Sequence, residues 1–181
     1  MVRLATFVVL LLAGIAVAGG LADALHGTVF VPAAPAILTV HLAWSGVTLP
    51  MGVGLAILAG YLQDLDSGGV IGLSALAYGL AFVGLHRIAR RISAPGAVGR
   101  ALWSGLWTLL VDVWVAVGLY VLLPWVRLAH LAERSVWQGV FWHVAATALW
   151  APAVWLAADR IYARVGLFRR GLAVEGGGAR R

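Results

Sequence analysis

Residues 60–76, GYLQDLDSGGVIGLSAL, form a polar interruption between two apolar segments and set where the chain folds back on itself. The interruption carries two carboxylates, Asp64 and Asp66, beside a Ser-Gly-Gly turn. Gly68 and the glycine after it can adopt the positive φ that a sharp reversal needs, and Asp66 or Ser67 is suited to cap the following helix. We therefore expect a helical hairpin, with Asp64 hydrated at its tip or in contact with a partner protein.

The composition around this turn is that of an integral membrane protein. Of the 181 residues, 62% are hydrophobic and 11% are charged, whereas soluble domains contain about 25% charged residues. Cysteine is absent, which excludes disulfides and Cys-ligated zinc or iron–sulfur sites. An all-α, polytopic membrane fold is therefore predicted.

The apolar segments divide into six expected spans. No charged residue lies between Asp23 and Asp64, a run of 40 residues that is too long for one crossing and suits two short ones. Pro35 and Pro50 are placed to open these two helices, because proline is tolerated in the first turn of a helix and not in its middle. A single kinked helix is the alternative and would leave five spans. The six predicted spans lie near residues 4–24, 34–48, 50–63, 69–88, 101–123 and 136–158.

The arginines orient these spans. All 13 basic residues are Arg, and with the N-terminus inside, 11 of them fall on the cytoplasmic side, as the positive-inside rule requires. Only Arg127 and Arg134 face out. We therefore expect a multi-pass protein of the cytoplasmic membrane with both termini in the cytoplasm, a basic, disordered tail at 166–181, and no nucleic-acid binding. The start of the chain also fits a cleavable signal peptide, but its length favours a retained first helix.

Three arginines follow the fourth span. Arg87, Arg90 and Arg91 share one helical face by their i, i+3, i+4 spacing. Such a face suits anionic lipid head groups or an acidic partner. The favoured interpretation is that they are ordinary topology determinants.

Polar groups inside the spans are candidates for chemistry. Asp112 is the one acid deep within a span, and inserting it costs about 2.5–3.5 kcal/mol on translocon scales. On an antiparallel arrangement His41 lies at a similar depth and His143 about one turn away, so the geometry allows a hydrogen-bonded Asp–His contact. The favoured role is a structural polar contact, or a neutral Asp112 bonded to Thr108; a proton relay is the alternative.

Enzyme chemistry is not predicted at the turn. A calcium loop would need a ligand where Gly68 stands and a bidentate Glu where Ala75 stands. Glycosidase chemistry needs carboxylates from opposite walls of a cleft, not two residues apart on one turn. We expect no catalytic residue, no metal and no cofactor.

The order of these features resembles the MreD family of rod-shape-determining membrane proteins. Residues 51–91 are similar to its signature region, in which a Gly-rich helix ends in an Asp-Leu-x-Ser-Gly turn, followed by a short Leu/Ile-Gly step and a basic loop. The turn corresponds to Asp64, Leu65, Ser67 and Gly68, with Gly72 and Leu73 after it. Residues 32–44 resemble the proline-led second span.

The resemblance extends over roughly residues 33–165. Asp112 is similar to the family's aspartate in the fifth span, and Pro152 lies in a segment similar to the last span. Two residues depart from the pattern: Asp66 is an extra acid in the turn, and His41 stands where an aliphatic or aromatic residue is usual.

The resemblance implies a non-enzymatic component of the bacterial cell-elongation complex. Its expected partners are MreC, the MreB filament, the RodA glycosyltransferase with its class B penicillin-binding transpeptidase, and membrane lipids. The MreD fold resembles the substrate-binding subunits of energy-coupling-factor transporters, so a small-molecule-binding transporter subunit is the alternative function.

Small residues are expected to allow close helix approach in the signature region. The glycines in question are Gly52, Gly60, Gly72, Gly79 and Gly84.

Overall fold

The computed structural model describes residues 2–24, 31–68, 70–93, 95–122 and 134–164. These residues form six helices and no strand, which confirms the all-helical prediction. The helices are α1 (Val2–Ala24), α2 (Ala34–Trp44), α3 (Leu49–Ser67), α4 (Leu73–Ala89), α5 (Ala97–Leu122) and α7 (Arg134–Arg164). The turn within residues 60–76 joins α3 to α4.

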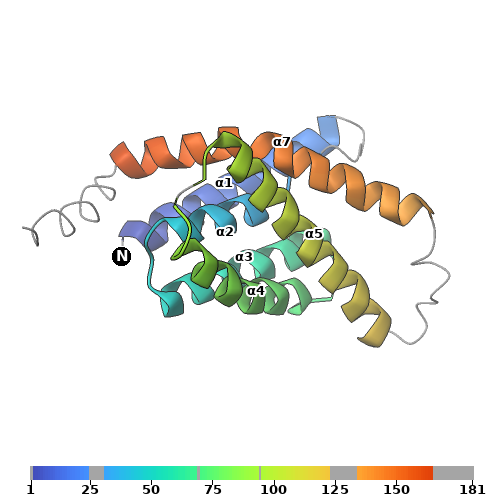
Figure 1. The fold of residues 1–181 in the computed structure, drawn as a ribbon. Helices are drawn as coiled ribbons and strands as arrows, with labels where there is room; N and C mark the ends of the chain where they lie inside the picture. The colour runs from blue at the N-terminus through green and yellow to red at the C-terminus, as the bar shows by residue number, and fades with distance from the viewer. Residues whose placement is uncertain (1, 25–30, 69, 94, 123–133, 165–181) are drawn as a thin grey trace, which may run out of the picture.

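Helix α2 lies at the centre of the bundle. It contacts α1, α3, α4, α5 and α7, and all ten residues of 34–43 are buried. Figure 1 shows α3 and α4 side by side as an antiparallel hairpin, with α7 along the other side of the bundle and α5 running between α7 and α4. A helix that is apolar around its whole circumference is stable only when it is surrounded, and α2 has that pattern.

The long uncharged run folds as two helices and not as one kinked helix. Pro35 and Pro50 each lie in the first turn of their helix, where a missing N–H costs nothing. Helix α2 ends earlier than expected, at Trp44, because Gly46 takes a positive φ of 70° and breaks the helical path. Helix α3 continues past residue 63 through Ser67, so the signature acids belong to its last turn.

Close packing between α3 and α4 depends on three of the five glycines. A Cβ added at Gly60 would lie 2.5 Å from the carbonyl oxygen of Ser74, and one at Gly79 would lie 2.7 Å from Ile57. A Cβ at Gly52 would collide with the ring of Phe82. A larger side chain on this interface would push the two helices apart.

The other two glycines have different surroundings. No other helix of the described chain comes within 4 Å of a Cβ built at Gly72 or Gly84, so the expected close approach is absent at these two positions within the described bundle. A glycine is required at residue 72 for another reason: its backbone φ of 96° lies in the left-handed region, which other residues rarely adopt. Gly84 lies on the outer face of α4 and is exposed.

Two described helices are long and apolar enough to cross a membrane, with the apolar stretches Ala97–Val121 and Val136–Arg164. Only 28% and 22% of their most apolar windows are buried inside the protein. Large side chains stand exposed on the outer face of α5: Leu102, Leu106, Leu110, Val113, Trp114, Val117 and Val121. Monomeric soluble proteins rarely leave an apolar surface of this extent open to water.

Candidate functional site

The carboxylate of Asp64 caps helix α4 from the end of α3. Its Oδ2 accepts hydrogen bonds from the backbone N–H groups of Gly72 (2.8 Å) and Ala75 (3.3 Å), and its Oδ1 accepts one from Ser74 (3.0 Å). The first N–H groups of a helix have no partner within the helix, and the residue before α4 is a glycine with no side chain to cap them. A negative charge at this end also interacts favourably with the helix dipole.

The expectation of a hydrated Asp64 is therefore wrong. Asp64 is only 3% exposed, whereas Asp66 is exposed and Ser67 donates its hydroxyl to the carbonyl oxygen of Asp64 at 3.3 Å. The physical reason lies one helical turn earlier, where Gly60 allows the α3 backbone to touch the start of α4. Residues four apart share a helix face, so this close approach brings Asp64 against the open N–H groups.

Glycines complete the turn. Gly68 ends α3 with a φ of 65°, as the sequence predicted, and Gly72 precedes α4 with a φ of 96°. Gly69, the second glycine expected in the reversal, lies outside the described residues. Among the described signature residues, Asp64, Gly68 and Gly72 each have a role in forming the turn.

Asp112 pairs with His143 between α5 and α7. Asp112 Oδ2 and His143 Nδ1 are 3.0 Å apart, and their side chains are 15% and 31% exposed. His41, which was expected nearby, lies elsewhere. Thr108 does not bond Asp112 but donates its hydroxyl to the carbonyl oxygen of Ser104 at 3.0 Å. The contact fits the structural interpretation of Asp112.

A threonine extends this contact to α2. The Thr147 hydroxyl donates to the carbonyl oxygen of His143 (2.8 Å) and accepts the N–H of Ala33 (3.0 Å), which precedes the first turn of α2. Thr147 is fully buried. The polar atoms near Asp112 therefore tie together α2, α5 and α7.

His41 belongs to a second cluster, at the other end of α2. Its Nε2 lies 2.8 Å from Oδ1 of Asp159 on α7, and Oδ2 of Asp159 lies 3.2 Å from Nη1 of Arg100 on α5. The imidazole stacks on Tyr162 with ring centroids 5.6 Å apart and meets the edge of Trp155 at 5.2 Å. The Arg100 guanidinium lies 5.0 Å from the centre of the Trp155 ring, a distance suited to a cation–π contact.

The sequence did not point to Asp159 or Arg100. Asp159 stands beside Arg160 just after an apolar segment, which is typical of an interfacial charge. Its partner is 118 positions away in the chain and is brought close only by the packing of α2 against α7. The available signal was His41 itself, a polar side chain in an uncharged helix that needs a partner.

A cavity of about 360 Å³ opens beside this second cluster. Its lining residues are His41, Trp44, Ser45, Arg100, Trp155, Asp159 and Ala163. A His–Asp pair resembles two members of a catalytic triad, but Ser45, the serine that lines the cavity, donates its hydroxyl to the carbonyl oxygen of Leu42 at 2.8 Å. The contacts of Asp159 with His41 and Arg100 join α2, α5 and α7 beside this cavity.

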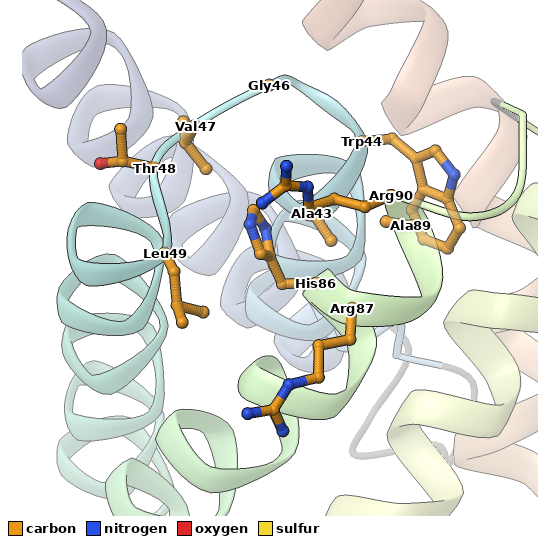
Figure 2. A pocket seen from close by; sticks show the side chains of 10 residues that line it. All are labelled: Ala43, Trp44, Gly46, Val47, Thr48, Leu49, His86, Arg87, Ala89 and Arg90. Carbon is orange, nitrogen blue, oxygen red and sulfur yellow. The ribbon is translucent and has the colours of Figure 1, made fainter.

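The three signature arginines do not form a single face. Helix α4 ends at Ala89, so Arg90 is the first residue after the helix and Arg91 the second, and all three arginines are exposed. In Figure 2 the side chains of Arg87 and Arg90 point in different directions. Both line a separate cavity that Arg91 does not touch.

Within the described residues, no group of three or more His, Asp or Glu side chains is placed to hold a metal ion. Comparison with protein-family models, with curated proteins and with solved structures finds no match for this chain. The resemblance to MreD rests on the sequence features alone, and membership of that family stays a prediction.

Proposed function

We propose that this protein is a non-enzymatic membrane scaffold of the MreD type, which binds MreC and supports cell-wall elongation guided by MreB. The observation that carries the proposal is that three acidic side chains bond groups on neighbouring helices. Asp64, Asp112 and Asp159 each bond a group on another helix. Acidic groups engaged in this way join neighbouring helices and support a structural role for each acid.

The proposed setting is the cytoplasmic membrane. The apolar outer faces of α5 and α7 favour lipid contact, since exposed apolar side chains are stable there without a protein partner. Six crossings follow if the four other described helices also span, as the sequence predicts. RodA and its class B transpeptidase would then be neighbours in the same complex.

The distribution of charge along the bundle supports the proposed orientation. Trp44, at the end of α2, lines the cavity beside Arg100 and also the cavity beside Arg87 and Arg90. The end of α4, the start of α5 and the end of α7 therefore meet at one end of the bundle. These are the ends expected in the cytoplasm under the positive-inside rule.

Co-purification with MreC tests the proposal. The full chain, solubilised in mild detergent, is expected to retain tagged MreC from the same genome, and deletion of its gene is expected to turn rod-shaped cells round. The matched control is a tagged single-span membrane protein of the same length that has no role in elongation. Retention of neither protein, together with normal rods in the deletion strain, would refute the scaffold.

The alternative function is a small-molecule-binding subunit of a transporter. One observation favours it: the 360 Å³ cavity beside His41 has the size of a small-ligand site and carries both signs of charge. Native mass spectrometry of gently purified protein would then detect a stoichiometric small molecule. Protein that carries only lipid and detergent would count against this function and leave the scaffold in place.

A further inference from the structure

A cavity lies under the connection between α2 and α3. It has a volume of about 610 Å³, within the roughly 300–1,000 Å³ of small-molecule sites. Figure 2 shows it bordered by the end of α2, the connection over Gly46, the start of α3 and the end of α4. Its lining residues are Ala43, Trp44, Gly46, Val47, Thr48, Leu49, His86, Arg87, Ala89 and Arg90.

Positive charge in this cavity is not balanced by an acid. The guanidinium of Arg90 lies beside the imidazole of His86, and both face the α2–α3 connection (Figure 2). Within the part of the chain that the structure describes, neither Arg87 nor Arg90 forms an ion pair. None of the described residues that line the cavity is Asp or Glu.

His86 supplies a buried polar group without a partner. The residue is 7% exposed, and its Nδ1 is buried with no hydrogen-bond partner among the described residues. The ring is held in place by stacking on Phe82, with centroids 5.8 Å apart. Buried polar atoms in native proteins are almost always paired, so Nδ1 of His86, in the wall of this cavity, is open to a hydrogen bond with a ligand.

The start of α3 adds backbone donors. Helix α3 is 19 residues long, begins at Leu49 in the cavity wall, and is preceded by Thr48, whose side chain caps no N–H. Pro50 has no N–H, and the Gly52 N–H donates to the carbonyl oxygen of Thr48 at 2.9 Å, so the open backbone donors at this end are those of Leu49 and Met51. They lie at the positive end of the helix dipole. Phosphate groups bind readily at helix N-termini, and arginine matches their geometry with two parallel hydrogen bonds.

We propose that this cavity binds a phosphate group, held by Arg90, His86 and the N-terminus of α3. The phosphate has two possible sources, the head group of an acidic membrane lipid and a free phosphate compound in the cytoplasm. The binding site rests on the cavity alone, and only the lipid source depends on the proposed membrane orientation. Failure of MreC binding would therefore leave this proposal intact.

Ligand binding to the full chain in neutral detergent tests the site. Phosphatidylglycerol, phosphatidylcholine and inorganic phosphate are titrated separately, and binding is followed by native mass spectrometry and by the melting temperature. We expect phosphatidylglycerol or inorganic phosphate to raise the melting temperature, and phosphatidylcholine to have a smaller effect. Phosphatidylglycerol binding alone assigns a lipid head group, and binding of inorganic phosphate at the same concentrations assigns a soluble compound.

Paired variants distinguish a site from diffuse charge. Arg90→Gln should weaken binding of the phosphate-bearing ligand at least about tenfold, since it removes a charge-assisted contact. Arg91→Gln removes the same charge one residue further on, outside the cavity, and should change the affinity less than twofold. His86→Phe keeps a ring against Phe82 but removes both nitrogens. It should weaken binding, whereas without ligand the variant should melt at the same temperature as the wild type.

Two results would overturn the proposal. One is an equal loss of affinity in Arg90→Gln and Arg91→Gln, which would mean that anions respond to the overall charge of this end of the bundle. The other is wild-type protein whose melting temperature and mass spectrum respond to neither phosphatidylglycerol nor inorganic phosphate.

Discussion

Replacing Asp64 by Asn is the sharpest test of how the signature turn is held. The carboxylate accepts three backbone N–H groups of α4 through two oxygens. An amide has one oxygen, so at least one of these N–H groups must face an NH₂ group. The better orientation keeps the oxygen opposite Gly72 and Ala75 and loses the bond from Ser74.

The expected cost can be worked from these contacts. A hydrogen bond to a charged group contributes about 1.5–3 kcal/mol, and a charge at a helix N-terminus about 0.3–1 kcal/mol. Part of the loss is offset because a neutral amide is easier to bury than a carboxylate. Asp64→Asn should therefore lower the free energy of unfolding by about 2–3 kcal/mol, or the melting temperature by about 4–12 °C for a chain of this size.

Asp66 offers a matched control in the same turn. It is exposed and bonds no described group, so Asp66→Asn should change stability by less than about 0.5 kcal/mol. Melting of the full chain in detergent, followed by tryptophan fluorescence and circular dichroism, measures both variants. If Asp64→Asn melted within about 1 °C of Asp66→Asn, the reasoning that assigns Asp64 to the cap would be refuted.

Three further predictions concern the helix contacts. A double-mutant cycle with Asp112→Ala and His143→Ala should give a coupling free energy of about 0.6–1.7 kcal/mol, as interhelical polar contacts in membranes do; zero coupling would contradict the pair. Gly60→Leu should prevent normal α3–α4 packing and sharply lower the melting temperature, whereas Gly84→Leu, with open space around it, should melt like the wild type. Equal melting temperatures of the two variants would exclude the close approach at residue 60. Asp159→Asn should lower the free energy of unfolding by about 1–3 kcal/mol, a modest loss because solvent screens a carboxylate that is 30% exposed. The variant should also show stronger acrylamide quenching of tryptophan fluorescence, and unchanged stability and quenching would argue against a role of Asp159 in joining α2, α5 and α7.

The signature turn illustrates how a motif residue can be structural. Two carboxylates beside a Gly-rich turn suggest a metal or catalytic site, but Asp64 accepts the backbone N–H groups at the start of α4, and Asp66 is exposed and bonds no described group. The turn fixes the angle and the spacing of the α3–α4 hairpin. A partner protein that recognises this hairpin would depend on Asp64 through the shape of the turn and not through contact with its carboxylate.

The helices themselves could be predicted from the sequence. Apolar length, the breaks at charged residues and the position of each proline are local properties, so the separation of α2 from α3 and the start of α3 near Pro50 followed from them. The left-handed glycine at the end of α3 was equally local, because a reversal next to a helix end requires positive φ. The basic cavity itself could not be predicted from the sequence, because its walls come from three separate segments of the chain. The sequence showed only the arginines at the end of α4.

The partner of each buried acid was decided by tertiary structure alone. Asp112 has two histidines at compatible depths in the sequence, and only the packing of α5 on α7 selects His143 and leaves His41 to Asp159. The burial of Asp64 likewise depends on the missing side chain of Gly60, which lets two backbones touch. Hydrogen bonds act over about 3 Å, whereas hydropathy and spacing fix the position of a helix only to within a turn, which is about 5.4 Å. The sequence by itself therefore determines which segments are helices and which polar groups need partners, and the packing of the helices determines which partner each one finds.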